Sequence, residues 1–153
     1  MASVKTQLED FLEYDLPTMQ FKTDFEVCLD EDDVYLGQQE RATRSPFEVA
    51  IKHVGRTKLS SKTGVQRRHR FELTVYSRGH DRHEEYELSS KTLDVADEVV
   101  DRYDGTKGGL TILRAGLPGL KFERARARRG VAHLVGESSR KAIVKLEIDV
   151  WEC

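Results

Sequence analysis

The residues with the most evident chemistry in this sequence are arginines, and they gather in two stretches. Residues 121–130, KFERARARRG, have arginine at positions 124, 126, 128 and 129, and residues 55–69, GRTKLSSKTGVQRRH, contain no acidic residue. A guanidinium group is planar and always charged, so it binds carboxylates and phosphates through paired hydrogen bonds. These stretches therefore indicate binding either to an acidic protein surface or to nucleic acid.

No pattern in the sequence is typical of catalysis or of a bound cofactor. His80 and His83 lie close together, but zinc needs three or four convergent ligands, and no CxxC or HExxH spacing is present. The acidic stretch at 29–33, LDEDD, lacks the glycine and the distal glutamate of an EF-hand loop, and we interpret it as a solvated turn. There is no GxSxG motif for a nucleophile. We therefore expect no enzyme: no catalytic or cofactor-binding residue, no metal and no cofactor.

The charges are distributed in alternating blocks, although the net charge of the chain is only -2. Residues 1–40 carry 11 acids and 2 bases (-9), and residues 41–80 carry 10 bases and 2 acids (+8). Residues 81–110 carry 9 acids and 4 bases (-5), and residues 111–153 carry 9 bases and 5 acids (+4). Nucleic-acid binders usually keep a positive overall field, whereas alternating blocks suit a protein that presents opposite charges to neighbouring proteins. Blocks that interleave and cancel within the fold are the alternative.

Hydrophobic spacing predicts a helix and two strands in the first half of the chain. Residues 4–16 have helical spacing, with Ser3 as the N-cap and Pro17 after the end. Residues 46–54 and 70–78 alternate apolar and polar side chains, as half-buried strands do. A short strand is also expected at 34–38. We interpret residues 55–69 as a flexible basic loop, an arm that becomes ordered against a partner.

The second half of the chain is predicted to contain one helix and two long strands. Residues 91–104 have an apolar helical face, with Ser89 or Ser90 as the cap. A Gly-rich linker is expected at about 104–120, with a short strand at 110–114. Residues 120–128 and 140–151 read as strands, the second central in its sheet. In the first, Phe122 and the arginines share one face, and Ala125 and Ala127 share the other.

This order of elements predicts an α+β fold: a mostly antiparallel sheet with two helices packed on one face. The length suits a single domain over residues 1–153. No apolar run is long enough to span a membrane, and two widely separated cysteines favour a reducing compartment.

We expect the basic residues to contact neighbouring subunits, because no helix-turn-helix, RNP-like strand or zinc finger is present for reading nucleic acid. The predicted inter-subunit contacts are Arg56, Lys58, Lys62, Arg67, Arg68, Arg124, Arg126 and Arg128. Direct binding of nucleic acid remains the alternative.

The layout resembles the tail-terminator, or tail-completion, family of tailed phages and archaeal tailed viruses. The features that carry the resemblance are the opening helix VKTQLEDFL, the strands PFEVAIKHV and RFELTVYSR, the helix TLDVADEVVDRY and the closing strand AIVKLEIDVW. The likeness covers most of the chain as architecture and hydrophobic pattern. The basic 55–69 segment and the long 104–120 linker depart from the family's usual pattern.

The resemblance implies a structural virion protein that forms a ring, commonly a homohexamer, at the end of the tail tube. Such a ring terminates tail polymerisation and joins the tail to the head or neck. The implied partners are other copies of the chain, the tail tube protein and a neck or connector protein, with DNA possible in the channel. The implied location is the virion, and the host cytoplasm during assembly. A different head-tail connector or neck adaptor is the nearest alternative.

Overall fold

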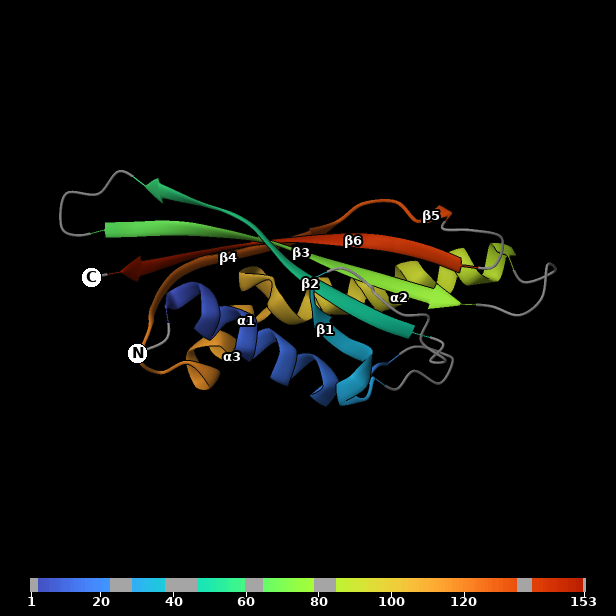
Figure 1. Ribbon diagram of the computed structural model, residues 1–153, viewed down its shortest axis with the longest axis horizontal. Coiled ribbons are helices and arrows are strands. Elements are labelled where there is room, and N and C mark those ends of the chain that lie inside the picture. The colour runs from blue at the N-terminus through green and yellow to red at the C-terminus, as the bar shows by residue number, and fades with distance from the viewer. Residues whose placement is uncertain are drawn as a thin grey trace.

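The computed structural model describes residues 3–22, 29–37, 47–59, 65–78, 85–134 and 139–152. The protein has the α+β fold that the sequence predicts, and the described residues form three α-helices against one face of a mostly antiparallel sheet (Figure 1). Within the described residues, no helix has the length and apolar character needed to cross a membrane.

The helices are α1 (Val4–Asp15), α2 (Glu85–Tyr103) and α3 (Gly109–Gly116). The strands are β1 (Val34–Leu36), β2 (Phe47–Leu59), β3 (Val65–Arg78), β4 (Lys121–Arg129), β5 (His133–Leu134) and β6 (Ser139–Glu152). Short 3₁₀ turns lie at Leu16–Thr18, Glu31–Asp33 and Gly105–Lys107.

The strand order is β1-β2-β3-β6-β4, with β5 also paired to β6. Strand β1 runs parallel to β2, and the other neighbours are antiparallel. The predicted strand at 140–151 corresponds to β6, which lies between β3 and β4 and is therefore interior, as expected. Strand β3 pairs with β2 on one side and with β6 on the other along nearly all of its length, so both of its edges are hydrogen-bonded.

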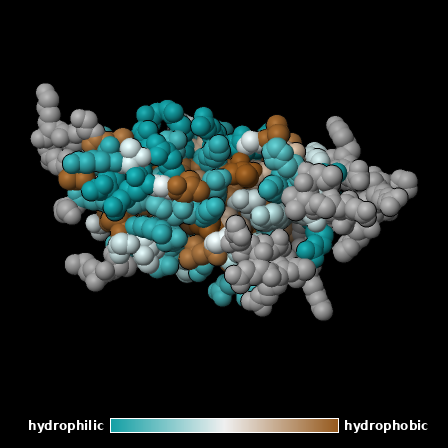
Figure 2. All heavy atoms as spheres, turned by 45° about the horizontal axis from the view of Figure 1, so that its top comes forward, coloured by the Kyte–Doolittle hydropathy of each residue, from teal (hydrophilic) through white to brown (hydrophobic). Residues whose placement is uncertain are grey.

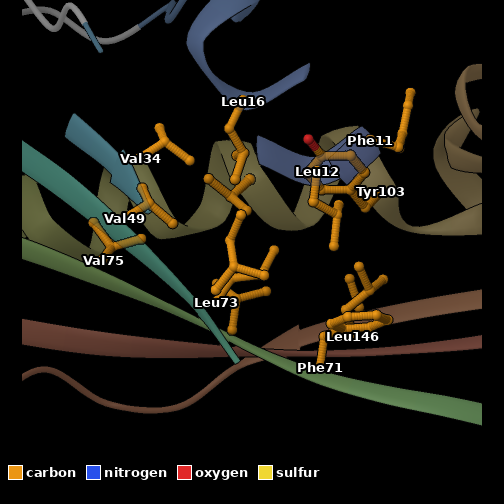
Figure 3. Packing of buried hydrophobic residues seen from close by; sticks show 14 of the residues in the cluster. Phe11, Leu12, Leu16, Val34, Val49, Phe71, Leu73, Val75, Tyr103 and Leu146 are labelled. Atoms are coloured by element: carbon orange, nitrogen blue, oxygen red, sulfur yellow. The ribbon is translucent and has the colours of Figure 1, made fainter. Parts of the chain in front are cut away.

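The core lies between the helices and the sheet (Figure 3). Leu12 of α1, Leu16 of the following 3₁₀ turn and Tyr103 of α2 are fully buried on the helix side. Leu73 and Leu146 are fully buried on the sheet side. Burying such side chains stabilises the fold by about 1.5–3 kcal/mol each. Small side chains at Ala125 and Ala127 are buried where α2 approaches β4, as the sequence predicts.

A buried polar cluster joins α1 to α2. Arg102 donates to both oxygens of Asp15 at 2.7 Å, and the Tyr103 hydroxyl donates to Asp15 Oδ2 at 2.8 Å. Burial, followed by the neighbouring Asp15 charge, raises the pKa of Tyr103 well above its usual value, so the hydroxyl remains a donor.

The interpretation of residues 55–69 as a loop is wrong for 55–59 and 65–69, which belong to β2 and β3. After a bulge between His53 and Gly55, pairing continues from Gly55–Arg70 to Leu59–Gln66. Strand β6 pairs with β3 as far as Val65, so the backbone of β3 is satisfied on both sides. The hairpin extends past the helix layer (Figure 1). We call its described end, 55–59 and 65–68, the basic arm.

The predicted 104–120 linker contains helix α3, and the expected strand at 110–114 is wrong. Gly108 has a φ of 100°, which an L side chain rarely adopts, and Gly109 packs directly on the end of α2. A Cβ at Gly109 would lie 2.2 Å from the Tyr103 carbonyl oxygen. Two glycines therefore allow a tight turn from α2 into α3, which buries Leu113 in the core.

Two other expectations are corrected. Helix α2 begins at Glu85, so Ser89 lies inside it and not at its cap. A shift of register between Phe122 and Arg124 places Phe122 in the core with Ala125 and Ala127, and not on the face that carries the arginines.

Candidate interaction surfaces

The arginines of β4 lie on the face of the sheet that points away from the helices, which we call the outer face. Arg124, Arg126 and Arg128 are all exposed, because alternate residues of a strand share a face and Ala125 and Ala127 occupy the other. Lys145 of β6 is also exposed and pairs across the strands with Arg128. Seen from this side, the surface is mostly hydrophilic with a few apolar residues among the polar ones (Figure 2).

Two carboxylates, those of Glu147 and Asp149, lie beside the β4 arginines, but Arg68 of β3 binds them. Arg124 and Arg126 lie opposite Asp149 and Glu147 in the strand register. Arg68 of β3 approaches the same carboxylates from the other side, with its Nε 2.8 Å from Asp149 Oδ1, its Nη2 3.1 Å from Asp149 Oδ2 and its Nε 3.5 Å from Glu147 Oε2. The hydrogen bond to Asp149 raises the pKa of Arg68. Asp149 is 4% exposed and already has a paired counterion.

Four cations on this face, Arg124, Arg126, Arg128 and Lys145, form what we call the cationic row, and the carboxylates described beside it are bound by Arg68. Among the described residues, none of the four makes an ion pair. At about 3.4 Å per residue, the three arginines extend over roughly 14 Å. An exposed guanidinium array of this kind can bind carboxylates or phosphates.

The basic arm has a counterion of its own at the end of β6. Arg67 Nε lies 2.7 Å from Glu152 Oε2, and Arg56 Nη1 lies 3.7 Å from the same atom. Lys58 is exposed, and Lys62 lies outside the described residues. Part of the arm's positive charge is therefore neutralised within the chain, which the sequence did not indicate.

Two hydrogen-bonded histidines lie next to these arginines, the fully buried His69 and the half-buried His53. His53 Nε2 lies 3.1 Å from His69 Nδ1, and His69 Nε2 lies 2.9 Å from Glu152 Oε1. Burial, followed by the charge of His69, lowers the pKa of His53 to about 4. Burial also lowers the pKa of His69 in spite of Glu152. Both rings are neutral at pH 7, so His69 donates from Nε2 to the Glu152 side chain and accepts at Nδ1 from His53.

An acidic groove on the helix side was missed by the sequence reasoning. Asp10, Glu13, Tyr14, Asp30 and Glu31 line most of it, with a cavity volume of about 600 Å³, and none of the described residues that line it is basic. Tyr14 is 77% exposed. Residues 29–31 thus form one wall of a groove, and the available signal was the pairing of Asp10 and Glu13 on the polar face of α1.

A second groove lies along α2, with a cavity volume of about 710 Å³. Its four acids, which include Asp94 and Asp97, are balanced by bases. Lys107 Nζ is 2.6 Å from Asp101, and Arg129 pairs with Asp97. It is therefore electrostatically less distinctive than the groove on α1.

The described residues hold no group of three or more histidine, cysteine, aspartate or glutamate side chains that could bind a metal ion.

Five of the predicted inter-subunit contacts lie in two places. Arg68, Arg124 and Arg126 border one small cavity on the outer face. Arg56 and Arg67 meet at Glu152.

No protein family and no curated protein matches this chain. Among solved structures, the chain is similar to a chain of the virion of a native gene transfer agent particle. The identity is 14%, the match covers 80% of this chain and 81% of that chain, and the TM-score is 0.37. This is a weak structural likeness.

Proposed function

We propose that this chain is a structural virion protein that forms a ring at the end of a tail tube. The ring would terminate tail polymerisation and join the tail to the head or neck, with the tail tube and neck proteins as its partners. The protein would reside in the virion, would assemble in the host cytoplasm and would have no enzymatic activity. The proposal rests on the resemblance of its sequence layout to the tail-terminator family.

The structural observation that supports the proposal best is the separation of opposite charges onto opposite sides of the subunit. The cationic row lies on the outer face, and the acidic groove lies in the helix layer. A ring requires a heterologous contact, in which one surface of a subunit meets a different surface of the next. Opposite charges on such surfaces set the register and disfavour wrong pairings.

Size-exclusion chromatography with light scattering tests this proposal on the purified protein over a wide range of concentrations. A discrete oligomer of ring size, visible as a ring by negative-stain electron microscopy, is the expected result. A hexamer is the expected stoichiometry. A protein that stays monomeric at every concentration would refute the ring.

The basic arm provides a second test, because its length is the feature that extends beyond the subunit core. Lys58 and Arg67 face each other across the hairpin, so an Asn-Gly turn can replace residues 59–66 between them. The shortened protein should unfold cooperatively and keep its helix content by circular dichroism, while its assembly weakens. Normal assembly of the shortened protein would mean that residues 59–66 make no subunit contact that assembly needs.

The cationic row also favours one other candidate function, contact with DNA in a channel or elsewhere. Phosphate contacts of this type need no base recognition and weaken steeply as salt concentration rises. Tight, salt-dependent binding of duplex DNA by a persistent monomer would favour this function over the ring.

A further inference from the structure

We infer that the cationic row of one copy docks in the acidic groove of a second copy. The inference rests on the proposed ring, and it names the two surfaces that meet. It concerns the outer face of the sheet, on which none of the described helices packs (Figure 1).

The first argument is the local charge on each surface. Arg124, Arg126, Arg128 and Lys145 are four exposed cations, and the described residues offer none of them an ion pair. The nearby carboxylates of Glu147 and Asp149 are bound by Arg68. Within the described part of the chain, the row is therefore exposed and able to bind carboxylates of a second copy.

The second argument is the set of carboxylates in the groove and the room that it offers. Asp10, Glu13 and Glu31 line the groove and can face the cations of the row, while Asp30, which also lines it, interacts within its own subunit. Asp10 and Glu13 are three residues apart on α1, so their side chains neighbour each other on one helix face. A cavity of about 600 Å³ has room for several arginine side chains.

The third argument is the exposed aromatic ring in the groove. Tyr14 is 77% exposed, the most exposed large apolar side chain in the described part of the protein, and it lies beside Glu13. Arginine stacks on tyrosine faces, and the attraction grows as water is excluded. Tyrosine and arginine are also the residues that dominate binding energy at protein interfaces. An arginine row therefore fits this groove better than lysines alone would.

The fourth argument is the placement of the two surfaces on the subunit. The cationic row is on the outer face of the sheet, whereas Asp10, Glu13 and Tyr14 belong to α1 on its other face (Figure 1). One copy cannot bring its own row into its own groove. Each subunit can then give its row to one neighbour and its groove to the other, as a ring requires.

Charge reversal on the full-length protein tests the pairing. Arg126→Glu and Glu13→Arg should each weaken self-association by about tenfold or more, because each places like charges across the interface. Lys5→Glu is the matched control for Arg126→Glu: it makes the same charge change at an exposed site near the start of α1, outside both surfaces. Its self-association should equal that of the unmodified protein, measured by sedimentation velocity at fixed salt.

Mixing the two variants gives the decisive result. In the mixture, the unchanged cationic row of the Glu13→Arg variant can enter the unchanged acidic groove of the Arg126→Glu variant. At the other contact, the acidic group introduced by Arg126→Glu meets the basic group introduced by Glu13→Arg, so the two charges are exchanged but still opposite. An equimolar mixture should therefore assemble where each variant alone does not, and the double variant should assemble by itself. Circular dichroism and urea unfolding confirm that each variant is folded.

Two outcomes would overturn the inference and leave the ring in place: both single variants assemble normally, or the mixture fails to recover assembly. If Arg126→Glu loses only the retention of a 30-base-pair DNA duplex and assembles normally, the row binds phosphate and the inference is wrong. Failure of the unmodified protein to assemble would instead refute the proposed ring itself.

Discussion

Replacing Asp15 tests whether the buried polar cluster fastens α1 to the rest of the protein. Asp15 is 8% exposed and accepts two hydrogen bonds from Arg102 and one from Tyr103. In Asp15→Ala the fully buried Tyr103 hydroxyl loses its acceptor, which costs about 1–3 kcal/mol. Arg102 also loses its counterion. Breaking a fully buried ion pair costs several kcal/mol, but Arg102 keeps partial access to water, so only part of that cost is expected here.

We therefore expect Asp15→Ala to lower the free energy of unfolding by about 2–4 kcal/mol. Asp15→Asn keeps an acceptor for one of the donors and should cost roughly half as much. The assay is urea unfolding at pH 7 with unchanged m-value. Asp94→Ala, at an exposed site on α2, is the control and should change stability by no more than about 0.5 kcal/mol. Equal losses in Asp15→Ala and the control would refute the reasoning.

The elements with an undisturbed hydrophobic period could be predicted from the sequence. Strand β6 has an apolar residue at every second position from Ala142 to Val150, and α2 has a continuous apolar face, so local spacing alone identified both. The Ser3 cap was also predictable, because its side chain accepts from the Thr6 N–H within one helical turn. The fold class follows from these elements and their order.

The strand segments of the basic arm could not be predicted, because their stability is not local. Residues 65–68 are rich in charge, and they are strand because β2 and β6 pair with them from both sides. Helix α3 could not be predicted for a related reason. The glycines at its start are typical of a linker, and only the contact of Gly109 with the end of α2 explains why glycine is present there.

The candidate surfaces were predictable only in part. The exposed arginines of β4 follow from alternation with alanine, but the register shift before Arg124 moved Phe122 to the other face. The acidic groove is formed by α1 together with residues 29–31, which are distant from α1 in sequence, so no local pattern predicts it. Glu152 as the counterion of Arg67 likewise depends on strand pairing across the sheet.

Two further predictions follow from the buried histidines and from the turn into α3. In the folded protein, burial keeps His53 and His69 neutral, so the unfolded chain binds more protons below about pH 6.5, and stability should fall from there to about pH 4. His53→Asn should reduce the change in the free energy of unfolding between about pH 6.5 and pH 4, measured by urea unfolding at several pH values. The same pH dependence in the variant and the unmodified protein would mean that His53 does not contribute. Gly109→Ala should cost more than about 2 kcal/mol, because its Cβ would lie 2.2 Å from the Tyr103 carbonyl oxygen, whereas Gly119→Ala meets no atom within 4 Å. Similar unfolding midpoints for the two glycine variants would contradict the close packing of α3 on α2.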